Sequence, residues 1–147
     1  MLKRLATTTM CLALIACASA ERSPQQTGLE DMMERAQLAY HEGRMGDAER
    51  YLHEITQSHP TAAPAWLRLG NVFYRTGRYD AAVHAYEQAL RHDPRNGLAW
   101  HNLALTRMQQ ASDVVESGLE ASPVQSAERE ALLLLRDTLA AKLVSRP

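Results

Sequence analysis

Histidines are the side chains of this sequence that most suggest a metal site. There are six of them: His41, His53, His59, His84, His92 and His101. A zinc site on a helix takes two histidines four residues apart, or histidines combined with cysteines. No two of these histidines have that spacing, no H-E-x-x-H motif occurs, and both cysteines, Cys11 and Cys17, lie near the N-terminus. The sequence therefore predicts no metal site and no cofactor.

Motifs for nucleophilic or phosphate chemistry are also missing. The 147 residues contain no glycine-rich phosphate loop and no G-x-S-x-G nucleophile turn, and the 17 acidic residues are spread along the chain. The formal net charge is -1, whereas a nucleic-acid binder would carry an excess of basic residues. We therefore predict a protein that is not an enzyme and does not bind nucleic acid.

Covalent chemistry is predicted at one position near the N-terminus. Lys3 and Arg4 precede an apolar run over residues 5–16, and this run is too short to span a bilayer. It ends in Leu14-Ile15-Ala16-Cys17, which resembles the lipobox of bacterial lipoproteins. The resemblance implies that residues 1–16 are a signal peptide and that Cys17 carries the lipid. Several acyl chains on one residue give stable membrane attachment.

The same segment holds an alternative processing site. Ala18-Ser19-Ala20 before Glu21 fits ordinary signal peptidase, whose cleavage would release a soluble periplasmic protein. Ala18 is not the aspartate that marks inner-membrane retention in enteric lipoproteins. The expected location is therefore the periplasmic face of the bacterial outer membrane, with residues 17–28 as a flexible polar tether.

A period of 34 residues organises the rest of the chain. It aligns Met32 with Trp66 and Trp100, Gly43 with Gly77 and Ala111, and Pro60 with Pro94. The best copy is residues 63–96, and it carries Trp66, Leu69, Gly70, Phe73, Gly77, Tyr79, Ala82, Tyr86, Ala89 and Pro94. These residues resemble the tetratricopeptide repeat (TPR). The resemblance implies an all-α fold, a short right-handed α-solenoid of helix pairs with a C-terminal capping helix.

The residue types of the best copy have physical reasons. Small residues at Gly70 and Ala82 allow two antiparallel helices to approach closely. Trp66, Leu69, Phe73 and Tyr86 are expected to fill the wedge around that contact. Gly77 suits the turn between the helices, and Pro94 ends the second helix.

The predicted TPR domain covers residues 29–147. We expect repeats at 29–62 and 63–96, a partial repeat at 97–111, a polar linker at 112–125 and a C-terminal helix at 126–144. That helix is either a cap or the end of a third repeat, with Ala131 and Leu135 in the roles of Ala82 and Tyr86. Its leucine run, residues 132–135, would cover the end of the solenoid or contact a second copy in a homodimer.

A peptide-binding groove is implied by the family resemblance, because the first helix of each repeat lines a concave face. The expected groove residues are Tyr40, Leu67, Arg68, Asn71, Tyr74, Arg75, Asn102 and Leu105. Asn71 and Asn102 match the two asparagines of the carboxylate-clamp type of TPR domain. The lysines of that clamp are absent, since Leu67 and Leu98 stand in their places, which disfavours capture of a terminal carboxylate. The alternative is that these are ordinary solvated residues.

The resemblance implies a non-catalytic adaptor that binds protein or peptide segments of an envelope complex. Lipid anchor, tether and small solenoid together resemble outer-membrane lipoproteins that assist assembly of pili, secretins or the outer membrane. A soluble periplasmic scaffold for envelope or cytochrome assembly is the alternative, and a catalytic module is the least favoured. This expectation is an analogy between folds, since one fold serves many functions.

Overall fold

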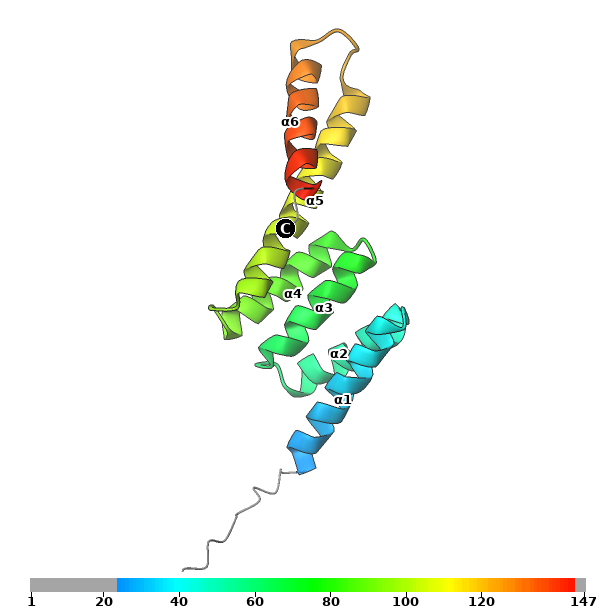
Figure 1. The fold of residues 1–147 in the computed structure, drawn as a ribbon, viewed down its shortest axis with the longest axis vertical. Coiled ribbons are helices and arrows are strands. Elements are labelled where there is room, and N and C mark those ends of the chain that lie inside the picture. Colours follow the sequence, from blue (N-terminus) through cyan, green and yellow to red (C-terminus); the bar gives the residue numbers. More distant parts are fainter. Residues whose placement is uncertain (1–23, 145–147) are drawn as a thin grey trace, which may run out of the picture.

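The computed structural model describes residues 24–144. Within this range the chain forms six α-helices in antiparallel succession (Figure 1). They are α1 (Pro24–His41), α2 (Met45–Ser58), α3 (Ala63–Arg75), α4 (Tyr79–His92), α5 (Gly97–Ala121) and α6 (Ala127–Val144). The described residues form no strand, so the predicted all-α solenoid is confirmed. The predicted signal peptide and Cys17 lie outside the described residues.

The turns inside the first two repeats have the same conformation, with a glycine at positive φ. Gly43 and Gly77 have φ of 77° and 73°, a region that favours glycine because it has no Cβ. In the second repeat the Arg78 N–H donates to the Phe73 carbonyl at 2.9 Å, and the Gly77 N–H donates to Tyr74 at 3.1 Å. Gly43 and Arg44 repeat both bonds in the first repeat. This pattern satisfies the last carbonyls of α1 and α3 and reverses the chain.

The period of 34 residues also appears in the hydrogen bonds of two tryptophans. The indole N–H of Trp66 donates to the Pro60 carbonyl at 2.8 Å, and that of Trp100 donates to the Pro94 carbonyl at 3.0 Å. Each bond ties the first helix of a repeat to the loop before it. The side chain of Asn96 caps α5 by accepting from the Ala99 N–H at 3.0 Å.

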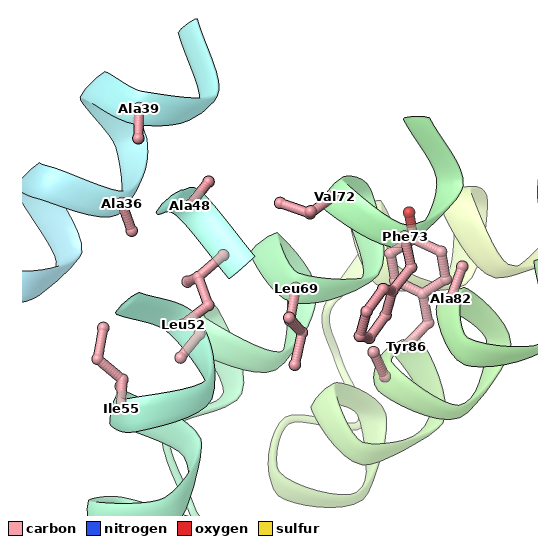
Figure 2. Packing of buried hydrophobic residues seen from close by; sticks show 12 residues of the cluster. Ala36, Ala39, Ala48, Leu52, Ile55, Leu69, Val72, Phe73, Ala82 and Tyr86 are labelled. Atoms are coloured by element: carbon pink, nitrogen blue, oxygen red, sulfur yellow. The ribbon is translucent and has the colours of Figure 1, made fainter. Parts of the chain in front are cut away.

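The core alternates small and large side chains (Figure 2). The close approach predicted at Gly70 is confirmed, because a Cβ built there would lie only 2.6 Å from Cδ1 of Tyr86. Leu69, Phe73 and Tyr86 are buried as expected, whereas Trp66 is only half-buried at the edge of the core. Glycine at position 70 therefore leaves room for a buried tyrosine ring between the two helices.

Two helix boundaries differ from the prediction. Helix α5 continues to Ala121, so the linker predicted at 112–125 is helical over most of its length. The reason is tertiary packing: Val115 and Leu119 are buried, and a Cβ on Gly118 would lie 3.0 Å from a methyl group of Leu132 in α6. At the other end α1 begins at Pro24, so residues 24–28 of the predicted tether are helical. Proline is well tolerated in the first turn of a helix.

The first half of α5 packs against α4, whereas its second half extends beyond α1–α4 and packs along α6 (Figure 1). Ala131 and Leu135 do not take the roles of Ala82 and Tyr86, since both are exposed and Leu132 makes the contact with α5 instead. Trp100, near the start of α5, stays 54% exposed. Helix α6 therefore covers the distal half of α5 and does not complete a third repeat in the geometry of the second.

Candidate peptide-binding groove

Two adjoining hollows run across the face formed by α1, α3 and α5. Their volumes are about 290 and 370 Å³, and they share Tyr40, Asn71 and Leu98. All eight predicted groove residues line one hollow or both. Tyr40, Leu67, Arg68 and Asn71 line the first, and Tyr40, Asn71, Tyr74, Arg75, Asn102 and Leu105 line the second. The structure thus brings residues from three helices together on one continuous surface.

Leu98 is the main groove residue outside the eight expected ones, although the resemblance already placed it at the position of a clamp lysine. It is 56% exposed and lines both hollows, so it stands at the centre of the surface. Its sequence signal is the spacing to Asn102, because Leu98 lies one helical turn before Asn102 just as Leu67 lies one turn before Asn71. Gln37, His41 and Tyr86 also contribute to the lining.

The two asparagines of the groove are bonded to each other. The Asn102 amide nitrogen donates to the Asn71 amide oxygen at 2.8 Å, and the Tyr86 hydroxyl donates to the same oxygen at 2.9 Å. Among the described residues, the Asn71 amide nitrogen and the Asn102 amide oxygen have no such partner. One donor and one acceptor therefore remain at the groove, which is the pair that a peptide group of a bound segment needs.

Tyr86 connects the hydrogen-bonded amides of Asn71 and Asn102 to the core. Its side chain is 1% exposed, and burial raises the pKa of its hydroxyl, with smaller contributions from Tyr40 and Tyr74. The hydroxyl therefore stays protonated and keeps donating to Asn71. Because one end of Tyr86 fills the space left by Gly70 and the other end holds Asn71, packing of the second repeat fixes the groove amide.

The two arginines of the groove are bonded to α1. Arg68 donates to the Gln37 side-chain oxygen at 3.0 Å. Arg75 donates to the Tyr40 carbonyl at 3.3 Å, and its guanidinium lies 5.1 Å from the centre of the Tyr40 ring. Such cation–π contacts add modest stability at exposed sites. Both arginines thus link the first repeat to the second. Their positive charges lie on the side of the groove that α1 forms.

The described residues offer little for other kinds of site. No three histidines, cysteines or acidic residues in the described chain are grouped as metal ligands would be. None of the described helices combines the length and apolar character that a membrane-crossing helix requires.

Comparisons with known proteins bear on the helix pair that forms the middle of the groove. Residues 63–96 match the family model of the tetratricopeptide repeat. The match supports a tetratricopeptide repeat at α3 and α4. These two helices supply Leu67, Asn71 and Tyr86, so the matched repeat carries the central part of the groove.

Two similar proteins contain repeats of the same family. The small glutamine-rich tetratricopeptide repeat-containing protein 2 of Mycosarcoma maydis is 27% identical over 92 residues, which cover 63% of this chain and 25% of that protein. The match thus spans a quarter of the length of this curated relative. The Arabidopsis OM64 TPR domain has a similar structure, with a TM-score of 0.54, 18% identity, and coverage of 78% of this chain and 96% of that domain. The second likeness concerns the fold alone.

Proposed function

We propose that this protein is a non-catalytic adaptor that binds a protein segment in the groove formed by α1, α3 and α5. The observation that carries the proposal is the continuous surface around Leu98, where apolar side chains lie beside a free amide donor and acceptor. Binding of proteins or peptides is the general role of tetratricopeptide domains, and the match of residues 63–96 supports the family.

The chemistry of the groove favours an internal segment over a chain terminus. Leu67 and Leu98 present apolar carbons, and Leu105 extends the apolar surface into the second hollow. The cations at its edge, Arg68 and Arg75, are held by bonds to α1. A segment with apolar side chains and an unpaired backbone would gain most from this surface, because it can bury its side chains and pair its amides.

The groove is tested by one substitution at Leu98, which lines both hollows. Leu98→Asp places a charge where the two hollows meet, and we expect the tagged full chain to recover its partner from membranes of its own host at least tenfold less well. Val124→Asp is the matched control, since Val124 is 83% exposed in the loop before α6. Equal recovery by both variants would contradict the proposed site.

For the location, we propose that Cys17 is lipidated and holds the groove at the periplasmic face of the outer membrane. Support comes from Leu14-Ile15-Ala16-Cys17 at the end of the apolar run. An adaptor held there would assist the assembly of a pilus, a secretion system or another envelope complex.

Cys17→Ser tests this location in the host. We expect the variant to leave the membrane fraction or to accumulate as an unprocessed precursor, and mass spectrometry of the wild type to find acyl chains on Cys17. A wild-type protein that starts at Glu21 would instead support the soluble periplasmic scaffold. Leu98→Asp is the control for this experiment, because it should change partner recovery without changing membrane attachment.

A further inference from the structure

Helix α6 has an outer stripe of small side chains around one leucine, and this stripe faces away from α5. Leu132, Leu133 and Leu139 are half-buried in the hairpin. The outer stripe consists of Ala127, Ala131, Leu134, Thr138 and Ala141, and all five are exposed. Leu134 is 71% exposed, and Leu135 beside the stripe is 46% exposed. Leu134 and Leu135 thus form an exposed apolar patch, and such a patch marks an interaction surface more often than isolated apolar side chains do.

The spacing of the outer stripe is that of a helix–helix seam. Its residues follow one another at intervals of four, three, four and three, which is the repeat that keeps one face of a helix against a partner helix. Small side chains at both ends allow close approach of the two backbones, and Leu134 supplies the central contact. Helix α6 and the second half of α5 extend beyond α1–α4 (Figure 1), and the five exposed residues of the stripe leave this face accessible to another molecule.

Charges beside the stripe indicate what that molecule is. Glu128 precedes Leu135 by seven residues, and Lys142 follows it by seven. When two α6 helices lie antiparallel with Leu135 at the two-fold axis, Glu128 of each faces Lys142 of the other. On the opposite edge Glu130 approaches Asp137 of the second copy, and two carboxylates repel each other. The guanidinium of Arg136 reduces this repulsion, because it bonds the Asp137 carboxylate at 2.9 Å within its own chain. Antiparallel helices also place their opposite dipole ends together.

We propose that two copies of this chain pair through the outer stripe of α6, antiparallel, with Leu134 and Leu135 near the two-fold axis. The pair of hairpins then forms a four-helix arrangement of two α5 and two α6 helices. Burial of the leucines drives the association, whereas the exposed charge pairs set its orientation. The dimer carries two grooves, so it binds a partner with two or more copies of a segment more tightly than one groove does. This inference is independent of the location proposed for the chain.

Charge reversal on the full chain tests the pairing and its orientation. The chain is purified in detergent, and its protein mass is measured by size-exclusion chromatography with light scattering over a range of concentrations. We expect a dimer for the wild type, a weaker dimer for Glu128→Lys or Lys142→Glu alone, and a dimer of wild-type strength again for the double reversal. Leu134→Glu should abolish the dimer, whereas Leu38→Glu, at a residue 54% exposed on α1, should not.

Three outcomes would overturn the proposal. The first is a wild-type monomer at all concentrations. The second is a dimer that Leu134→Glu leaves intact, because the interface would then lie elsewhere. The third is a dimer that Glu128→Lys does not weaken, because the two α6 helices would then not be antiparallel. In a parallel pair Lys142 would face Asp137 of the other copy, and Glu128 would face no cation. Circular dichroism of each variant checks that the exposed substitutions leave the helices folded.

Discussion

Gly70→Ala is the substitution for which the structure sets the clearest energetic expectation. The added Cβ would lie 2.6 Å from Cδ1 and 2.9 Å from Cζ of Tyr86, whereas ordinary contacts of a Cβ begin near 3.4 Å. Tyr86 is 1% exposed and its hydroxyl is bonded to Asn71, so turning the ring away from position 70 would break that hydrogen bond. Either the helices α3 and α4 move apart, or the ring turns and loses its bond to Asn71.

The magnitude follows from two opposing contributions. Overpacking of a well-packed core costs up to about 3 kcal/mol, and the overlap here belongs at the upper end. Alanine in place of glycine stabilises a helix interior by about 1 kcal/mol. The net loss in the free energy of unfolding is therefore about 2 kcal/mol. For a chain of this size, the loss lowers the midpoint of thermal unfolding by about 4 to 8 °C.

The assay is urea unfolding followed by circular dichroism, with a glycine in open space as the control. Gly28 lies in α1, and a Cβ there meets nothing within 4 Å, so Gly28→Ala should be neutral or stabilising. In the background Tyr86→Leu, which shortens the clashing side chain, Gly70→Ala should cost much less. If Gly70→Ala and Gly28→Ala change stability alike, the close helix crossing argued from Gly70 does not exist in solution.

Three further predictions concern the amides, the turns and the junction of the repeats. Asn71→Ala leaves the buried Tyr86 hydroxyl without its acceptor and should cost about 1 to 3 kcal/mol in urea unfolding; an unchanged midpoint would show that the bond is not formed. Gly77→Ala should cost about 1 kcal/mol through the positive φ alone, because a Cβ there meets nothing within 4 Å, and an equal stability would rule out that turn conformation. Hydrogen bonding to Arg78 lowers the pKa of Glu49, so its contribution is present above the usual glutamate pKa of 4.5 and is lost as the pH falls through the lowered value. The wild type should therefore exceed Glu49→Gln by up to about 1 kcal/mol at pH 7, and a difference that persists at pH 2 would contradict the ion pair.

Local patterns in the sequence predict the helix pairs and their turns. Gly43 and Gly77 stand at the same place in two repeats, and only a residue tolerant of positive φ fits that turn. Gly70 and Tyr86 belong to one helix pair close in sequence, so a small residue opposite a large one could be recognised before the structure was known. The eight groove residues lie in the first helices of the repeats, and it is the family resemblance that implies a concave face lined by those helices.

The repeat pattern does not predict the packing of residues 112–121 against α6 or the distance between α3 and α5. Residues 112–121 contain serines, acidic residues and Gly118, which are typical of a loop. They are helical because Val115 and Leu119 find a partner in α6, and tertiary packing overrides weak local preference. The bond between Asn71 and Asn102 depends on how closely α3 and α5 approach, and the period alone does not contain that distance.

The central claim is that the surface around Leu98 binds a protein segment, and site-specific photo-crosslinking tests it most directly. A photoreactive phenylalanine analogue is placed at Leu98 in the groove or at exposed Gln57 on α2, and the full chain is irradiated in its own host. The account predicts a discrete crosslinked product of higher mass from position 98 and none from position 57. Crosslinking from position 57 without any from position 98 would contradict it.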